Sequence, residues 1–265
     1  MKTFVFTAAL TALLAIAASA IAEELVTLPT RDGVTQSFVL STPDKQKPAA
    51  VVVLFPGGPG SIKLRMEDGR IKFGEENFLV RSRKMFVDGG VAAAVMDAPS
   101  DFPQGMDDWF RLGDKHATDI AAVVADLKKR FDSAPVYLVG TSRGTISAAA
   151  AGRTLGEAVA GVVLTSTLFL GGGRSGQGLS GFDFTAIRTP VLFVHHAEDG
   201  CKFTPYRNAK SLAAQFPLIT VRGGEPARSD PCEAFSAHGY LGKERETVEA
   251  MVNWLLKKPY PNNID

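Results

Sequence analysis

The sequence predicts an α/β fold with three layers, in which a mostly parallel, doubly wound sheet lies between two layers of helices. Strand-like and helix-like segments alternate along the chain, which is typical of a parallel sheet with helical crossovers. Residues 50–55 and 91–96 are continuous apolar runs, as expected of strands buried on both faces. After its first residues the chain has no repeat and no low-complexity linker, so we expect one domain over residues 23–265.

The expected elements follow one another in a regular order. Two early strands, at 24–29 and 34–41, enclose a turn at 31–33. The later elements are assigned from apolar runs and from the helical period of apolar residues. The expected later strands are 50–55, 91–96, 135–139, 159–164, 190–194 and 218–221, and the expected helices are 75–87, 113–131, one directly after residue 142, 206–215 and 243–258.

The composition is that of an ordinary globular protein and excludes one class of partner. Of 265 residues, 45% are hydrophobic and 22% are charged, and the formal net charge is +1. A nearly neutral chain has no basic excess that would attract nucleic acid, so we expect no such partner. The sequence has no closely spaced pair of cysteines and no HxxxH pattern, so we expect no metal site.

The first residues are typical of a secretory signal peptide. Lys2 precedes an apolar stretch, and two small-residue triplets follow at 18–20 and 20–22. We expect residues 1–22 to be a signal peptide that is cleaved after Ala22, with Ala20 as the competing site and an uncleaved membrane anchor as the alternative. The protein would then be exported, to a periplasm or out of the cell, with no membrane segment after cleavage.

Export changes the interpretation of the two cysteines. Cys201 and Cys232 form an even pair, and an oxidising compartment favours a disulfide between them. Such a bond would close a loop of about 30 residues and stabilise the fold by roughly 3–4 kcal/mol in the chain-entropy model. Two separate buried thiols are the alternative.

Residues 140–144 match the pattern G-x-S-x-G, with Ser142 at its centre. The motif directly follows an apolar strand and directly precedes a helix, which is the setting of a nucleophile elbow. Flanking glycines are expected because neighbouring chain crowds so sharp a turn. The helix start beside the serine favours a developing negative charge. We therefore expect Ser142 to be a nucleophile; an ordinary strand-to-helix turn with a capping serine is the alternative.

The elbow, the glycine-rich loop at 56–60 and the order of acid and then histidine after the serine resemble the α/β-hydrolase superfamily. The resemblance covers residues 24–258. It implies the fold of that superfamily and a serine–histidine–acid triad that needs no metal or other cofactor. Only about 20 residues separate the strand near 159–167 from the one at 190–194, so we expect no large cap domain over the site.

The resemblance also implies positions for the histidine and the acid. His238 stands in the loop before the last helix, where it would take the proton of Ser142 and return it to the leaving group. Asp199 follows a strand between serine and histidine, and we expect it to orient His238, with Glu198 as the alternative. The remaining histidines are expected to be structural: His116, His195 and His196.

Two backbone N–H groups are expected to form an oxyanion hole. The resemblance supplies one from Arg143, the residue after the serine, and one from the loop at 55–58. Aligning its glycines selects Gly58, with Gly57 as the alternative. Pro56 departs from the family pattern, which often has histidine there. If the disulfide forms, it would tie the loop of the acid to the loop of the histidine.

The function that the resemblance implies is a serine hydrolase that cleaves a carboxylic ester of a small acyl substrate through an acyl-enzyme. A peptidase, amidase or thioesterase on the same triad is one alternative, and a binding protein that has kept the fold without the chemistry is the other. Trp109 and Phe110 are expected either at the mouth of the site or in the core. No pattern in the sequence predicts an oligomeric state.

Overall fold

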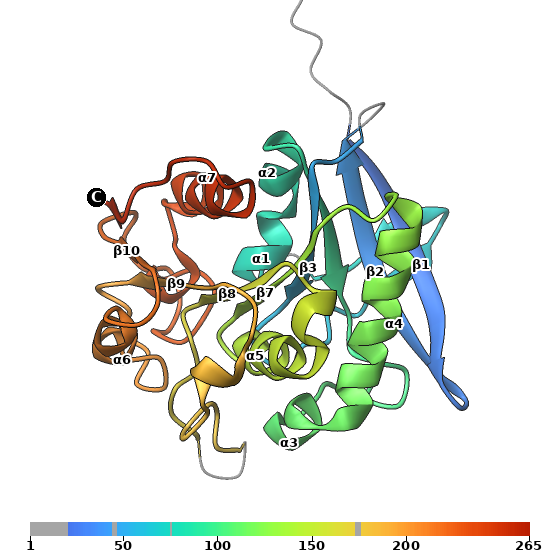
Figure 1. The fold of residues 1–265 in the computed structure, drawn as a ribbon, viewed down its shortest axis with the longest axis horizontal. Coiled ribbons are helices and arrows are strands. Elements are labelled where there is room, and N and C mark those ends of the chain that lie inside the picture. Colours follow the sequence, from blue (N-terminus) through green and yellow to red (C-terminus); the bar gives the residue numbers. More distant parts are fainter. Residues whose placement is uncertain (1–20, 44–46, 75, 173–175) are drawn as a thin grey trace, which may run out of the picture.

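The computed structural model describes residues 21–43, 47–74, 76–172 and 176–265. Within these residues, nine strands form one sheet in the order β1-β2-β6-β3-β7-β8-β9-β10-β11 (Figure 1). The first two strands and the β2–β6 pair are antiparallel, and all later neighbours are parallel. The strands are β1 (Ile21–Arg31), β2 (Val34–Pro43), β3 (Ala50–Phe55), β6 (Val91–Met96), β7 (Val136–Thr141), β8 (Gly161–Thr165), β9 (Val191–His196), β10 (Leu218–Val221) and β11 (Asn263–Ile264).

Helices cover both faces of the sheet and enclose two apolar cores. One core joins the sheet to α4 (Asp114–Arg130), α5 (Gly144–Leu155) and α6 (Tyr206–Leu212). The other joins it to α1 (Phe78–Arg81), α2 (Arg83–Asp88) and α7 (Glu244–Leu255). Figure 1 shows α2 and α7 on one side of the sheet and α5 on the other. The predicted three-layer α/β/α fold is therefore confirmed.

The central strands lie where the sequence predicts them, because their continuous apolar runs must be buried on both faces of the sheet. Every residue of β3, β6 and β7 is buried, as parallel strands covered on both faces require. Between β8 and β9, the described residues contain one 3₁₀ turn, η3 (Phe184–Ala186), and no helical lid.

The helix predicted over 75–87 is wrong in extent. It begins at Phe78, because the side chain of Asn77 accepts a hydrogen bond from Leu79 N at 3.1 Å and so caps the helix start. Ser82 then separates α1 from α2. Residue 75 lies outside the described residues. The elements that the sequence did not predict are short: the exposed hairpin of β4 (Arg65–Glu67) and β5 (Arg70–Lys72), helix α3 (Asp108–Leu112) and strand β11.

The predicted signal peptide falls outside the described residues except for its last two positions. Ile21 and Ala22 belong to β1, where they pair with Pro43 and Thr42 of β2. In the part of the chain that the structure describes, no helix has the length and apolar character needed to cross a membrane.

Candidate active site

Ser142 lies at a sharp turn between β7 and α5. Its φ of +51° is a left-handed conformation that few residues other than glycine adopt. The turn is possible because Gly140 and Gly144 have no side chains. A Cβ on Gly140 would collide with the backbone of Gly144, and a Cβ on Gly144 would collide with the carbonyl of Phe55 in β3. This is the geometry of a nucleophile elbow.

Asp199 and His238 form a hydrogen-bonded pair. Asp199 follows β9, and its Oδ2 lies 3.0 Å from Nδ1 of His238, which belongs to the 3₁₀ turn η4 (Ala237–Gly239). Both side chains are buried. The carboxylate also accepts hydrogen bonds from Cys201 N at 2.9 Å and from Thr204 Oγ1 at 2.8 Å. Glu198, the alternative acid, is exposed, and its N–H donates to His196 instead.

The environment of Asp199 favours its charged form. Burial acts to raise its pKa, but the hydrogen bond and the charge of His238 oppose burial, together with the charge of His195 and the N–H of Cys201. The net effect is a pKa below the ordinary value of an aspartate. An ionised carboxylate on Nδ1 fixes the tautomer of His238 that leaves Nε2 able to accept a proton.

The turn that carries His238 is anchored by hydroxyl groups. Ser236 Oγ accepts from His238 N at 3.2 Å, and Ser166 Oγ donates to His238 O at 2.8 Å. Tyr240 has a φ of +59° and donates its buried hydroxyl to Val194 O at 2.8 Å. These bonds connect the loop of the histidine to the ends of β8 and β9, so the position of the imidazole is coupled to the sheet.

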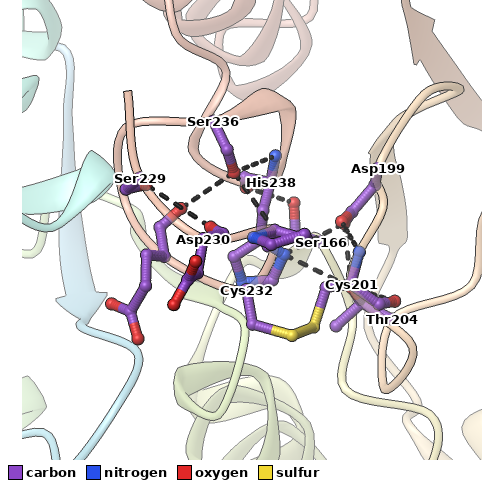
Figure 2. The surroundings of a disulfide bond; sticks show 11 residues. Ser166, Asp199, Cys201, Thr204, Ser229, Asp230, Cys232, Ser236 and His238 are labelled. Atoms are coloured by element: carbon purple, nitrogen blue, oxygen red, sulfur yellow. Dashed lines mark hydrogen bonds and ion pairs between the residues drawn. A yellow bond between two sulfur atoms is a disulfide. The ribbon is translucent and has the colours of Figure 1, made fainter. Parts of the chain in front are cut away.

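The predicted disulfide between Cys201 and Cys232 is present. It joins the segment after Asp199 to the segment before His238, as Figure 2 shows. Cys201 contributes twice to the site, since its N–H also bonds to the carboxylate of Asp199. The disulfide therefore ties the loop of the acid to the loop of the histidine.

The glycine-rich loop after β3 lies against the elbow. Gly60 N donates to Gly57 O at 3.2 Å and closes a tight turn, in which Gly58 has a φ of +58°. A Cβ on Gly57 would lie 3.0 Å from the Cβ of Ser142, so the loop and the serine are in close contact. Arg143 opens α5 beside this loop.

A cleft of about 580 Å³ brings most of the predicted site residues together. Asp199 does not line it and lies behind His238. A smaller hollow of about 160 Å³, lined by Arg143, Leu168 and Phe203 among others, adjoins the cleft. The predicted residues that line the cleft are Gly57, Gly58, Ser142, Arg143, Cys201, Cys232 and His238.

The other candidates lie away from the cleft. Burial lowers the pKa of His116 to about 3 and that of His195 to about 4, so both are neutral at pH 7. His196 is buried and lies 3.0 Å through Nε2 from Gly223 O. Trp109 is 63% exposed and does not line the cleft, so it is at neither of its two expected places. Phe110 packs against the ring of Phe102.

Several residues around the site carry no local sequence signal. Thr204 and Ser166 reach the pair of Asp199 and His238 only through the tertiary fold. Asp108 and Arg111 of α3 are charged residues that are 1% exposed and are bonded to residues that line the cleft. A polar residue in a short helix of mixed composition has no pattern that predicts such burial, so these residues could be found only in the structure.

Neither family models nor curated proteins match this sequence. Solved structures do match: Est1E from Butyrivibrio proteoclasticus has a TM-score of 0.60 at 16% identity over 88% of this chain and 98% of that chain. A cold-adapted esterase from an Arctic intertidal metagenomic library has a TM-score of 0.59 at 18% identity over 90% and 94%. XC6422 from Xanthomonas campestris, described as an a/b serine hydrolase without lid, has a TM-score of 0.55 at 13% identity over 85% and 93%. The chain therefore has the α/β-hydrolase fold.

Proposed function

We propose that this protein is a serine hydrolase that cleaves a carboxylic ester through an acyl-enzyme. The observation that carries the proposal is the hydrogen bond of 3.0 Å between Asp199 and His238, because His238 lines the same cleft as the elbow serine, Ser142. The fold brings nucleophile, base and orienting acid to one place from three segments that are distant in the sequence, and this chemistry depends on their spatial arrangement.

In the proposed reaction, Ser142 Oγ attacks the acyl carbon while Nε2 of His238 takes its proton. The carbonyl oxygen becomes an oxyanion, which the N–H groups of Gly58 and Arg143 stabilise. The C–O bond to the alcohol then breaks, and His238 gives its proton to the departing oxygen. Water then attacks the acyl carbon of the acyl-enzyme while His238 takes its proton. The bond to Ser142 Oγ breaks, His238 returns the proton to that oxygen, and the carboxylic acid is released. Asp199 stays ionised and stabilises the imidazolium during both the formation and the hydrolysis of the acyl-enzyme.

The nature of the cleft supports a small acyl substrate. The described residues place no lid over it, and its walls combine apolar side chains and glycine backbone with the charged side chains of Lys63, Glu76, Arg143 and Glu233. Two of the similar structures are named as an esterase and as a serine hydrolase, which adds support for hydrolysis. Another, named as a prolyl endopeptidase, matches over 39% of its length at 15% identity and a TM-score of 0.59, so the test includes amides.

The test compares wild type with Ser142→Ala on short p-nitrophenyl esters, with Ser211→Ala in the exposed face of α6 as the control. We expect kcat of Ser142→Ala to fall by about 10⁶, as when a triad serine is removed, and Ser211→Ala to match wild type. Equal turnover by Ser142→Ala would exclude Ser142 as the nucleophile.

Further substrates separate the alternatives. Comparable rates on an ester and its matched anilide would indicate an amidase or peptidase, and preference for a matched thioester would indicate a thioesterase. An inert wild type that still reacts with a fluorophosphonate through Ser142 would be a hydrolase of another substrate. An inert wild type without such labelling would be a binding protein on this fold.

We also propose that the protein is exported to a periplasm or out of the cell. The disulfide supports this, because such bonds persist in oxidising compartments. Cleavage after Ala22 would remove two paired residues of β1, whereas cleavage after Ala20 would leave the strand whole. N-terminal sequencing of the protein recovered from outside the cytoplasm distinguishes the sites, and a retained Met1 would contradict cleavage.

A further inference from the structure

Helix α3 carries two buried charged side chains that the proposed reaction does not use, and both are bonded to residues that line the cleft. Asp108 and Arg111 are each 1% exposed. Buried charges are unfavourable unless hydrogen bonds and opposite charges hold them. Each of the two is bonded to one of the two residues of the proposed oxyanion hole.

Arg111 is bonded to the glycine-rich loop. Its Nη2 donates to Gly58 O at 3.2 Å, and its Nη1 donates to Ser147 Oγ of α5 at 3.0 Å. The guanidinium packs so closely on the loop that a Cβ on Gly60 would overlap it. Among the described residues, no carboxylate lies within ion-pair distance of Arg111, and its hydrogen bonds are made to these two oxygens.

Asp108 is bonded to the residue after the nucleophile. Its Oδ1 accepts from Nε of Arg143 at 3.0 Å and forms an ion pair with Nη2 of the same side chain at 2.8 Å. Its Oδ2 accepts from Gly178 N at 2.9 Å. Gly176 has a φ of +116° and packs directly on the carboxylate, where a Cβ would overlap it. The carboxylate therefore contacts both Arg143 and the segment at 176–178, and Asp108 lines the smaller hollow beside the cleft.

We propose that α3 is a clamp that holds the two oxyanion donors at a fixed separation, with Arg111 and Asp108 as positioning residues. The inference rests on the proposed function. Gly57 O is fixed by Gly60 N, and Gly58 O is fixed by Arg111. The peptide that carries the N–H of Gly58 is therefore restrained on both sides, at a residue that would otherwise rotate freely.

The clamp matters because an oxyanion hole works only if its donors are already in place. Donors that must move as the negative charge develops lose part of the stabilisation that they offer to the transition state. Arg143 is held through its side chain by the same helix, so the distance between the two N–H groups does not depend on the cleft being occupied. Loss of the clamp should lower kcat with little effect on KM.

The first test compares Arg111→Met with Ser147→Ala. Arg111→Met removes the bond to Gly58 O. Ser147→Ala keeps that bond and removes the contacts of Ser147 Oγ with the same guanidinium and with Nε2 of His116. We expect Arg111→Met to lower kcat on p-nitrophenyl acetate about 30-fold, since loss of a whole donor costs about 10²–10³, with KM within threefold. Ser147→Ala should stay within threefold of wild type, and Arg111→Lys, which keeps a donor, should recover part of the loss.

A second measurement does not depend on catalysis. Arg111→Met should speed amide hydrogen exchange in the peptide that contains residues 57–61, and Ser147→Ala should leave this exchange unchanged. The exchange measurement distinguishes failure of the clamp from failure of the proposed function. If wild type hydrolyses no ester, the proposed function fails, while faster exchange at residues 57–61 in Arg111→Met would still support the clamp.

The clamp is overturned if folded Arg111→Met keeps the kcat and the exchange of wild type. It is also overturned if Ser147→Ala lowers kcat by the same factor, because the effect would then be general packing of α5. If Arg111→Met does not fold, Asp108→Asn decides. It keeps the shape of the side chain and weakens the bond to Arg143, so we expect kcat to fall about tenfold, and an unchanged kcat would exclude the clamp.

Discussion

The two sides of the proposed active site are built by different means. Ser142 is held by the backbone: it sits between buried strands, and its turn exists because neighbouring chain passes where side chains would be. Asp199 and His238 lie on loops outside the sheet and are held by a disulfide and by single hydrogen bonds. The nucleophile therefore cannot be moved without disrupting the core, whereas the acid–histidine side can be loosened one contact at a time.

The largest expected effect comes from Gly144→Ala on the nucleophile side. The new Cβ would collide with the carbonyl of Phe55 in β3, and neither backbone can give way without opening the sheet. We expect the free energy of unfolding to fall by more than about 3 kcal/mol, with loss of activity. Denaturant unfolding followed by circular dichroism measures the change.

Gly113→Ala is the control for this prediction. A Cβ there would lie 3.3 Å from Trp109 O, its nearest neighbour, and the residue has a φ of −88° that any side chain adopts. We expect a loss of under about 1 kcal/mol at this helix start. Equal losses in the two variants would contradict the view that the elbow is fixed by close backbone packing.

The next effect comes from the disulfide on the acid–histidine side. Replacing Cys201 and Cys232 together with alanine removes a link across a sequence separation of 31, which the chain-entropy model values at about 3–4 kcal/mol. We expect stability to fall by about 3 kcal/mol and kcat to fall several-fold, because both loops of the pair lose restraint. Wild type in dithiothreitol should approach the double variant, and an unchanged kcat in both would show that the loops are held without the link.

The same difference between the two sides explains what the sequence predicted. The elbow is a local signal, since its glycines, its serine and its flanking strand are adjacent in the chain. The buried strands were likewise predicted because continuous apolar runs have few other solutions. Asp199 and His238 were located through the order of residues in a known family, and the structure brings them within 3.0 Å of each other.

What the sequence did not predict depends on contacts between distant segments. Thr204 donates to Asp199 from a loop of mixed polarity, and Arg111 is buried although its residue type is usually exposed. Trp109 illustrates the reverse, since a large apolar residue was expected near the core or the cleft and is exposed. The break at Ser82 was missed because it is a single residue with helical backbone angles between two short helices.

Thr204→Val removes a single contact on the acid–histidine side. Thr204 Oγ1 donates to Asp199 Oδ2 at 2.8 Å and lies 3.3 Å from Nδ1 of His238. Valine keeps the shape and removes the hydroxyl, so we expect a loss of about 1–2 kcal/mol in stability and a kcat about tenfold lower. Thr204→Ser keeps the donor and should resemble wild type. If valine and serine behave alike, the hydroxyl has no part in orienting the pair.

The smallest effect is a difference in acid sensitivity between the two sides. The pKa of Asp199 is lowered in the folded protein, because His238 and the neighbouring donors outweigh burial. A depressed carboxyl pKa contributes stability that is fully present above the unfolded value of about 3.9 and is lost as pH falls through the folded value. We therefore expect the free energy of unfolding to decrease more steeply below about pH 4 in wild type than in Asp199→Asn.

Denaturant unfolding at a series of pH values measures both slopes, and Asp230→Asn, a change in the loop before Cys232, is the control. Asp230 makes no side-chain ion pair with the described residues, so its variant should follow the wild-type curve. Parallel curves for wild type and Asp199→Asn would mean that the pKa of Asp199 is no lower in the folded protein than in the unfolded chain. The carboxylate of Asp199 would then make no pH-dependent contribution to the free energy of unfolding. The acid–histidine side would be held by the disulfide and the hydroxyl contacts alone.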